Sequence, residues 1–521
     1  MPVQLRERNV VQKDWRKVQL RIALCYPSTY RVGMTSLAIH LLYALFNQHP
    51  DVACERAFHV PGEPSRSLES GQLLSKFDVV AFSLQFETDF ANAVEMLQQS
   101  GISPLAANRE RPWVVAGGPC VMANPFPMLP FVDIFQIGDV EPVYQELLSA
   151  LLEAQNQTDF DSLLGPHFLL PERMTVQRAF VTDLDATFHP TCQILPDPPY
   201  PQELEPTFGQ SMLAEISRGC DRRCDFCMTT YQCSPRRERS LSTLIRIVEE
   251  GTDCTGVDKV ALLASGFTDH SDLKELLAGI VSKDKQLSVP SLRGDLKDTD
   301  IFNSIYEGGQ RTLTFAPEAG SEQLRTVIGK AIPDDKFKQV FNEALAAGFT
   351  QFKLYFMIGL PTETDQDIQA IHQFCVNLLE LSDRRHRLHV SVAPFIPKPH
   401  TPYQWVGLTP LNTLKKRLRL LVGLRRYGRI QLDLPNPRWA VIQAALSRGT
   451  SEIAPLLNSV ARKSERTAGT WFQTAKGLDL NLETLATAEY STEVQFLWDR
   501  IDVGIKRNTL LRQISRLELS E

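Results

Sequence analysis

Strand-like and helical segments alternate along this chain in two separate series, and this alternation is the feature that most constrains its fold. In the first series the apolar runs LRIALCYP, DVVAFSLQF, RPWVVAGGP and FVDIFQIGD are separated by segments with apolar residues at helical spacing, such as TSLAIHLLYALFNQ and EPVYQELLSALLEA. Apolar runs that alternate with amphipathic helices are typical of βαβ units, in which the strands are parallel. The sequence therefore predicts an α/β fold that begins with a doubly wound, Rossmann-like domain over residues 19–160.

The loops after the strands are the expected ligand-binding part of this domain. In open α/β sheets, ligands bind beyond the carboxyl ends of the strands. Because glycine has no side chain, a flat or phosphate-bearing ligand can approach the backbone closely where glycines occupy such loops. The candidate residues of this edge are Ser83, Gly117, Gly118, Gly138 and Asp139.

A proline-rich segment separates the two series. Residues 161–205 lose the alternation, and the stretch LPDPPYPQELEP indicates a linker. Six strand-like runs follow, with helical segments between most of them: MLAEIS, KVALLAS, LSVPSLRGD, RTLTFAPEAGS, FKLYFMIGLP and HVSVAPFIP. This series predicts a partial (β/α)6 TIM-like barrel over residues 206–425. Residues 426–521 show no clear strand series and predict a helical C-terminal region.

Composition argues against several functional classes. The net charge of −6 and the pI near 6.0 do not favour a general grip on nucleic acid or an anionic membrane, so neither is an expected partner. No apolar run is long enough to span a bilayer, and the charged N-terminal leader does not resemble a signal peptide, so we expect a cytoplasmic protein.

Thiols stay reduced in the cytoplasm, so the ten cysteines do not predict a disulfide framework. The scattered cysteines are expected to be small buried hydrophobes: Cys25, Cys54, Cys120, Cys192, Cys254 and Cys375.

Three cysteines are close together in the stretch EISRGCDRRCDFCMTTYQCSPRRERS. Cys220, Cys224 and Cys227 form a C-x3-C-x2-C array directly after a predicted strand, and Phe226 precedes the third cysteine. Thiolates are the ligands of iron–sulfur clusters, and such short spacings let one loop wrap a cubane. The neighbouring Arg222 and Arg223 would favour thiolates and offset the negative charge of a cluster. The array therefore predicts a metal site in a βα loop.

Two other interpretations of the array remain open from the residues alone. Cysteines at i, i+4 and i+7 also lie on one face of a helix, where they would be buried core residues. A zinc site with Cys233 as the fourth ligand is the other alternative, in which case the nearby arginines would form an interaction surface.

The array C-x3-C-x-aromatic-C at the end of the first strand of a partial barrel resembles the radical S-adenosylmethionine superfamily. The resemblance implies a 4Fe-4S cluster on Cys220, Cys224 and Cys227 and S-adenosyl-L-methionine as cosubstrate. It also implies that the strings ALLASGF, SLRGD, TFAPEAGSE and KLYFMIGLPTET contact the cosubstrate, although ALLASGF has a single glycine where the family usually has several. The implied cofactor-binding residues are Phe226, Ser265, Gly266, Arg293, Glu318, Ser321, Ile358 and Gly359.

The order of the two domains resembles the branch of this superfamily that carries an N-terminal cobalamin-binding-type domain. That resemblance implies cobalamin at Ser83, Gly117, Gly118, Gly138 and Asp139, methyl transfer as the reaction, and an electron donor such as flavodoxin or ferredoxin. The string Asp-x-His-x-x-Gly, whose histidine ligates cobalt in many cobalamin domains, is absent. Either cobalamin binds without a protein histidine or the domain has lost it. A cobalamin-independent rearrangement or sulfur insertion therefore stays an alternative, and neither the substrate nor the catalytic residues follow from the sequence.

Overall fold

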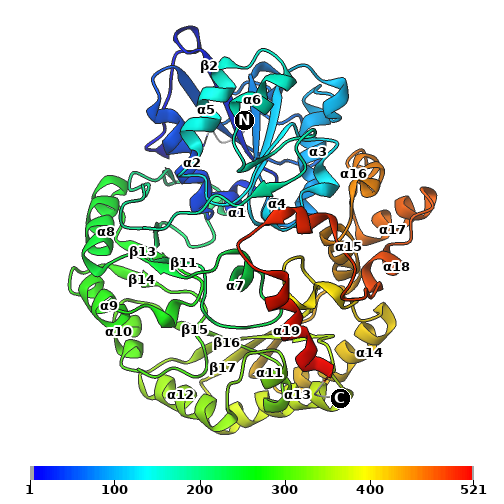
Figure 1. Ribbon diagram of the computed structural model, residues 1–521. Helices are drawn as coiled ribbons and strands as arrows, with labels where there is room; N and C mark the ends of the chain where they lie inside the picture. Colours follow the sequence, from blue (N-terminus) through cyan, green and yellow to red (C-terminus); the bar gives the residue numbers. More distant parts are fainter. Residues whose placement is uncertain (1–4, 519–521) are drawn as a thin grey trace.

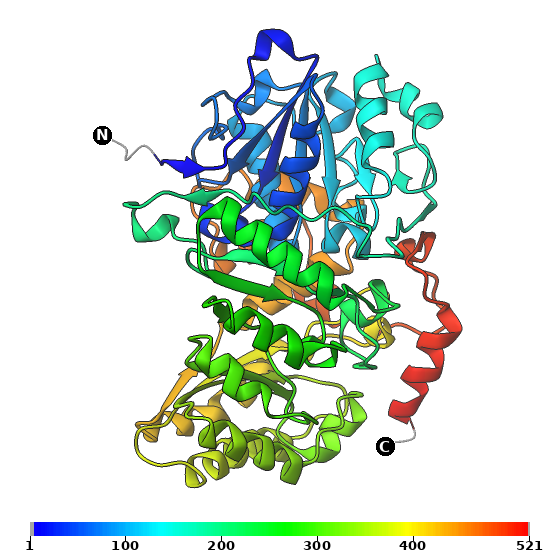
Figure 2. The ribbon, with the colours of Figure 1, turned by 90° about the vertical axis from the view of Figure 1, so that its left-hand side faces the viewer.

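The structure is a computed structural model, and it describes residues 5–518. An N-terminal α/β domain adjoins a ring of strands surrounded by helices, and C-terminal helices lie beside both (Figure 1). Seen from the side, the N-terminal domain is stacked on the ring (Figure 2). The last helix, α19 (Arg507–Glu518), runs along the outside of the ring. Within residues 5–518 no helix is long and apolar enough to cross a membrane.

A six-stranded sheet in the order β3-β2-β4-β5-β6-β7 forms the centre of the N-terminal domain. Five strands are parallel and β7 is antiparallel: β2 (Leu20–Tyr26), β3 (Val52–Phe58), β4 (Val79–Ser83), β5 (Trp113–Gly117), β6 (Ile134–Gln136) and β7 (Phe168–Leu169). Helix α3 (Phe90–Gln99) packs on one face, and α2 (Leu37–Gln48) and α5 (Tyr144–Glu153) pack on the other. The α/β prediction is confirmed, and the strand order reverses between β2 and β4, where such sheets bind ligands.

Strand β3 was not expected, because charged residues interrupt its apolar pattern. Glu55 and Arg56 lie in the middle of β3 and are 5% and 0% exposed. The Arg56 guanidinium is paired with Glu7 at 2.7 Å and with Glu69 at 2.7 Å, so its charge is compensated inside the protein. Buried charges are tolerated only when they are paired in this way, and sequence periodicity does not reveal the partners.

The predicted linker, residues 161–205, is tied to both neighbouring domains. It contributes β7 to the N-terminal sheet, β8 (Val176–Gln177) and β9 (Leu195–Pro196). Two of the scattered cysteines were wrongly expected to be reduced and buried. Cys192 of this segment is exposed, Cys254 is partly exposed, and the two form a disulfide with a Cα–Cα distance of 5.2 Å. The expectation failed because it rested on compartment alone, whereas folding brings the linker beside the end of α8 (Leu241–Thr255), where Cys254 lies.

The ring of strands is a barrel that does not close. Strands β10, β13 and β14 form one parallel sheet, and β15 to β18 form another. A single bridge between Leu292 and Phe315 joins the two sheets. The strands are β10 (Met212–Glu215), β13 (Lys259–Leu263), β14 (Gln286–Ser288), β15 (Thr312–Glu318), β16 (Gln351–Ile358), β17 (Arg387–Pro394) and β18 (Ile430–Asp433). The outer helices are α8, α9 (Leu273–Val281), α10 (Ile301–Glu307), α12 (Asp334–Ala346), α13 (Asp365–Glu380) and α14 (Leu411–Leu421).

The barrel strands show why the helices lie outside. On β16 every second residue, such as Phe352 and Phe356, is buried, and these rings pack against Phe341 of α12 and Phe374 of α13. The residues between them, including Lys353, are partly exposed on the opposite face. A period of two therefore separates an apolar face under the helices from a polar interior.

The region after residue 425 was predicted to be helical, and besides its helices it contains two short strands, of which β18 is the first. Strand β18 pairs in parallel with β17 and adds a seventh strand to the six that were expected. It spans only four residues, of which Ile430 and Leu432 are buried, so it is too short to give a clear strand pattern.

Helices then connect the barrel to the N-terminal domain: α15 (Arg438–Ser447), α16 (Ala454–Val460), α17 (Ala468–Gly477) and α18 (Leu482–Thr487). A short strand, β19 (Ile501–Asp502), pairs with β8 of the predicted linker. The buried carboxylate of Glu87, after β4, contacts Lys398 of the barrel and accepts a hydrogen bond from Gln443 of α15 at 2.8 Å. One carboxylate thus joins the three parts of the molecule.

Candidate functional site

The cysteine array lies in an open loop between β10 and a short helix. Strand β11 (Ser217–Arg218) leads to Gly219, and α7 (Met228–Gln232) begins directly after Cys227. Gly219 has φ of 82°, and a side chain there would come within 2.3 Å of the Cys233 carbonyl oxygen. Glycine is therefore required for the chain to turn into this loop. Because Cys220, Cys224 and Cys227 are not helical, the alternative of a buried helix face is wrong.

The three thiols differ in exposure. Cys224 is 8% exposed, whereas Cys220 and Cys227 are partly exposed. Burial raises the pKa of Cys224 to about 12, and the nearby Lys330 acts in the opposite direction. Burial raises the pKa of Cys220, and Arg222 opposes this as expected, through a hydrogen bond of its backbone and through its charge. The Arg222 guanidinium also pairs with Asp269, with Nε 2.9 Å from Oδ2. Lys330, which the sequence pattern did not single out, has the corresponding effect on Cys224.

A structural zinc ion needs four ligands gathered around it. Across residues 5–518, no three His, Cys, Asp or Glu side chains come together closely enough to hold one metal ion. In a four-iron cluster, by contrast, each thiolate binds a different iron. Cys233, the fourth ligand of the zinc alternative, lines a different cavity with Asp139 and Arg218. The structure gives no support to a zinc site of four cysteines.

Several of the predicted cosubstrate residues lie around this loop. Gly266, with φ of 78°, follows β13, and a side chain there would come within 3.4 Å of Cys220 Sγ. Ser265 immediately precedes it. Arg293 follows β14, and its positive charge acts to lower the pKa of Cys224. Its Nε lies 2.8 Å from Asp295 Oδ1. Glu318 ends β15 with φ of 70°, and its carboxylate is 2.8 Å from Lys330 Nζ.

The charged members of this set already have partners in the protein. Asp295 holds Arg293 and Lys330 holds Glu318, so each charge is oriented before any ligand binds. Sequence reasoning missed Asp295 and Lys330, although Asp295 is only two residues from Arg293 and is visible in the string SLRGD. Lys330 is brought close by the fold, and no local signal indicated it.

The remaining predicted residues fall into two groups. Ser321 caps α11 (Glu322–Val327), because its Oγ accepts from the Leu324 N–H at 3.1 Å and donates to Asp367 at 2.5 Å. Its hydroxyl is thus already used by the protein. The Ile358 side chain is fully buried, which leaves its backbone as the part available to a ligand. Gly359 follows with φ of 81° and donates its N–H to the Glu363 carboxylate at 2.5 Å.

Phe226 packs inside the barrel mouth. It contacts an apolar cluster at the carboxyl ends of β15 and β16 that includes Ala319, Leu360 and Phe395, and Met357 packs against the same cluster. This contact attaches the cysteine loop to the ends of β15 and β16.

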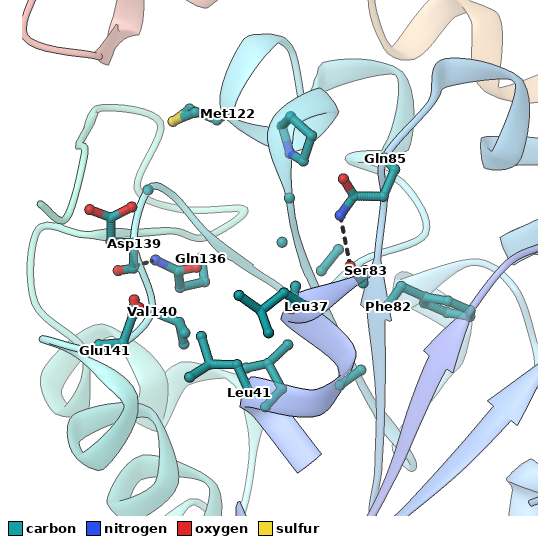
Figure 3. Close-up of a pocket in the computed structure, with 18 of the residues that line it drawn as sticks. Leu37, Leu41, Phe82, Ser83, Gln85, Met122, Gln136, Asp139, Val140 and Glu141 are labelled. Atoms are coloured by element: carbon teal, nitrogen blue, oxygen red, sulfur yellow. Dashed lines mark hydrogen bonds between the residues drawn. The ribbon is translucent and has the colours of Figure 1, made fainter. Parts of the chain in front are cut away.

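A cavity of about 330 Å³ lies at the carboxyl edge of the N-terminal sheet. Leu37 and Leu41 of α2 form an apolar part of its lining (Figure 3), to which Phe46 of the same helix also contributes. Its polar lining includes Gln85 and Gln136, whose amides donate to Ser83 Oγ and to the Asp139 carbonyl oxygen. All five residues predicted for this edge line it: Ser83, Gly117, Gly118, Gly138 and Asp139.

The glycines of the cavity do not all serve a ligand. A side chain at Gly118 would come within 2.5 Å of the Leu84 carbonyl oxygen, and one at Gly138 within 2.2 Å of the Ala179 carbonyl oxygen. These two glycines are needed for contacts within the protein. Around Gly117 the nearest atom is Gln136 Oε1 at 3.5 Å, so this glycine leaves room in the cavity itself.

Asp139 was expected to meet a ligand, but the protein already holds its carboxylate. Its two oxygens lie 3.0 Å from Arg218 and 2.9 Å from Arg237, and the Val181 N–H also donates to it. Burial alone would raise the pKa of Asp139, but Arg218, the Val181 N–H and Arg237 outweigh it and hold the pKa below its usual value. Asp139 is thus an anionic contact between domains.

Histidine is absent from the described lining of the cavity. His40 lies on α2 and is buried, with its Nε2 3.1 Å from the Met34 carbonyl oxygen, and burial lowers its pKa to about 4. It is a core residue, as its position on an apolar helical stripe indicated.

Comparison with known proteins identifies both parts of the chain. Residues 38–164 match the family described as radical SAM proteins, N-terminal, and residues 214–375 match the radical SAM superfamily. The uncharacterized protein MJ0966 of Methanocaldococcus jannaschii is 32% identical over 443 residues, which cover 85% of this chain and 91% of that protein. The uncharacterized methyltransferase PH0819 of Pyrococcus horikoshii is 25% identical over 58% of this chain and 67% of its own length.

A solved structure shares the fold. The radical S-adenosylmethionine methyltransferase TsrM from Kitasatospora setae, determined with cobalamin and a [4Fe-4S] cluster bound, aligns with a TM-score of 0.52 at 14% identity. The alignment covers 74% of each chain. At this identity the likeness concerns the fold alone.

Proposed function

The chain belongs to the radical S-adenosylmethionine superfamily, and from this premise we propose that it is a cobalamin-dependent methyltransferase acting on a substrate yet to be identified. The observation that carries the proposal is the placement of the cavity at the edge of the N-terminal sheet. Its wall includes Arg218 and Cys233, which flank the cysteine loop in the sequence. A ligand in this cavity would therefore adjoin the loop that holds the proposed cluster.

Cys220, Cys224 and Cys227 would hold a 4Fe-4S cluster. They fit it because three thiols lie close together in sequence on one non-helical loop at the carboxyl end of the first barrel strand. Three thiolates leave one iron free for S-adenosylmethionine. When bound, the cluster would supply the electron that cleaves the cosubstrate to methionine and a 5′-deoxyadenosyl radical.

Residues around the loop would orient the cosubstrate. Gly266 gives the backbone close access beside Cys220. Arg293 offers a positive charge near Cys224 for a carboxylate, and Glu318 offers acceptors for ribose hydroxyls. The backbone at Ile358 and Gly359 would lie against the adenine. Asp295, Lys330 and Glu363 already fix these groups, so little conformational entropy would be lost when the cosubstrate binds.

The cavity of the N-terminal domain fits part of a cobalamin. Its apolar lining from α2 suits a flat aromatic group, and the amide oxygens of Gln85 and Gln136 in its wall suit amide side chains. Because no histidine lines the cavity in the described chain, cobalamin would bind here without a histidine ligand to cobalt. An electron donor of the flavodoxin or ferredoxin type would reduce the cluster.

Two alternatives from the sequence have different standing. A cobalamin-independent radical rearrangement or sulfur insertion uses the same barrel, and cobalamin binding separates it from our proposal. Sulfur insertion with an additional cluster would need a second cysteine array. None is evident in the N-terminal domain, where Cys25, Cys54 and Cys120 are far apart in the sequence and buried. A zinc-binding interaction module is not supported by the family or by the loop geometry.

The proposal is tested by anaerobic reconstitution with iron and sulfide, followed by dithionite and S-adenosylmethionine, with and without methylcobalamin. We expect cluster-dependent formation of 5′-deoxyadenosine and retention of cobalamin through gel filtration. The variant in which Cys220, Cys224 and Cys227 are changed to Ala should bind no cluster and form no 5′-deoxyadenosine.

Cys375→Ala is the matched control, because Cys375 is buried in α13, outside the loop, and its loss should leave the cluster unchanged. A full iron and sulfide content in the triple variant would overturn the cluster assignment. Formation of 5′-deoxyadenosine by a protein that binds no cobalamin would instead favour the cobalamin-independent alternative.

A further inference from the structure

One arginine connects the cavity to the cysteine loop. The Arg218 guanidinium contacts three carboxylates, of Asp139 at 3.0 Å, Glu141 at 2.9 Å and Glu215 at 2.9 Å. Asp139 and Glu141 follow β6 of the N-terminal domain, whereas Glu215 ends β10 of the barrel. The contacts to Glu141 and Glu215 are both two-pronged, with further distances of 3.4 Å and 3.0 Å. Arg218 therefore spans the boundary between the two domains.

A second arginine holds the same loop from the neighbouring strand. Arg237 lies on β12 (Arg237–Glu238) and is paired with Arg218 across the β11–β12 ladder. It donates to Asp139 at 2.9 Å and to the Val181 carbonyl oxygen at 2.6 Å. The loop after β6 is thus fixed to β11 and β12 together.

These contacts are shielded from water. The Arg218 side chain is 18% exposed, and the side chains of Asp139, Glu141 and Glu215 are 17%, 9% and 16% exposed. Charge-assisted, two-pronged contacts of arginine fix geometry more strictly than contacts of lysine, because the guanidinium donors are held in one plane. Burial also limits screening by salt. The network is suited to hold a defined spacing.

Its position links the two proposed cofactor sites. Asp139, Glu141, Glu215 and Arg218 all line the cavity, and Arg218 is separated from Cys220 only by Gly219. A displacement of the loop after β6 would move the rim of the cavity relative to the cysteine loop. A second ion pair, between Glu87 and Lys398, also crosses from the N-terminal domain to the barrel, but neither of its residues lines the cavity.

We infer that Arg218 is a positioning residue that sets the distance between a corrinoid in the cavity and the iron–sulfur cluster. This inference rests on the proposed function and adds a role for a residue in the wall of the cavity, beside the cysteine loop. Without Arg218, Glu141 would lose the cation that it is paired with, while Asp139 and Glu215 would keep only Arg237 and Arg239. The mutual repulsion of the three carboxylates would widen the gap at the cavity rim.

The experiment compares wild-type protein with Arg218→Gln after reconstitution with the cluster and cobalamin. Reduction with dithionite gives a paramagnetic cluster and cob(II)alamin, so electron paramagnetic resonance can report the influence of one on the relaxation of the other. We expect the variant to keep the iron content, the cluster signal and bound cobalamin, but to lose the relaxation enhancement of cob(II)alamin by the cluster. Arg218→Lys should restore it only in part, because an ammonium group cannot bind all three carboxylates in one plane.

Two further variants keep the test decisive. Glu141→Gln removes one carboxylate and should cause a smaller loss of enhancement, which covers the case in which Arg218→Gln does not fold. Arg246→Gln, which removes an exposed pair with Glu250 on α8, is the matched control and should behave as wild type.

The outcomes separate this inference from the proposed function. A wild-type protein that binds no cobalamin overturns both. If wild type binds cobalamin with a clear relaxation enhancement, and Arg218→Gln and Glu141→Gln show the same enhancement, the proposed function stands and the positioning role is overturned. Loss of thermal stability with an unchanged enhancement would likewise reduce Arg218 to a structural contact.

Discussion

Substituting Arg56 by Met should destabilise the N-terminal domain more than most single changes in this chain. Arg56 is 0% exposed and compensates Glu7 and Glu69, whose side chains are only 6% and 1% exposed. Its guanidinium also lies over the Tyr43 ring, 5.2 Å from the centroid. Methionine retains much of the apolar packing but leaves both carboxylates without a cation.

The expected loss is worked from these contacts. Removing one partner of a buried ion pair costs about 3–5 kcal/mol, because the remaining charge stays buried without compensation. For a domain of this size we expect the thermal transition to fall by about 2–4 °C per kcal/mol, or about 6–20 °C in total. The double variant Arg56→Met, Glu69→Gln should recover part of the loss, since it removes one of the unpaired charges.

The assay is thermal unfolding followed by tryptophan fluorescence and calorimetry. Trp15 reports this region directly, because its Nε1 donates to Glu55 of the same strand at 2.6 Å. Arg66→Met is the control, since Arg66 is exposed and its NH1 donates only to the Gly71 carbonyl oxygen. If Arg56→Met lowers the transition no more than Arg66→Met does, the argument from buried charge is refuted.

Three further predictions concern the edge of the N-terminal sheet. Gly117→Val should fold but lose cobalamin retention in gel filtration, because the new side chain enters the cavity without a clash closer than 3.5 Å at its first atom; undiminished retention would place the corrinoid elsewhere. Gly118→Ala should lower thermal stability by about 1–3 kcal/mol, because φ of 112° and the Leu84 carbonyl oxygen at 2.5 Å both oppose a side chain; a melt identical to wild type would contradict this. Asp89→Asn should stabilise the protein at pH 8, because burial, and then the charge of Glu87, raise the pKa of Asp89 to about 7 from its usual 3.8. Stability from the protonated carboxyl is complete below pH 3.8 and lost as the pH rises through 7, so the difference between variant and wild type should grow over that window in denaturation curves, to a ceiling of about 4 kcal/mol; a difference independent of pH would exclude this cause.

The α/β class and the position of the cysteine array could be read from the sequence, because both depend on local pattern. A strand buried on both faces needs a continuous apolar run, as in β2 and β5, and a helix on the sheet needs an apolar stripe, as in α2. The spacing of Cys220, Cys224 and Cys227 is likewise local. The candidate residues of the first domain followed from topology, since parallel strands place their following loops at one edge.

Only the tertiary structure decided what depends on partners far apart in the sequence. Strand β3 is possible because Glu7 and Glu69 compensate Arg56, and the disulfide exists because the chain returns Cys192 to Cys254. Asp139 was predicted as a ligand contact, yet Arg218 and Arg237 engage it across the domain boundary. The physical reason is common to these cases. The sequence pattern records which residues avoid water, whereas the pairing of buried charges and thiols depends on distances that are set only when the domains pack together.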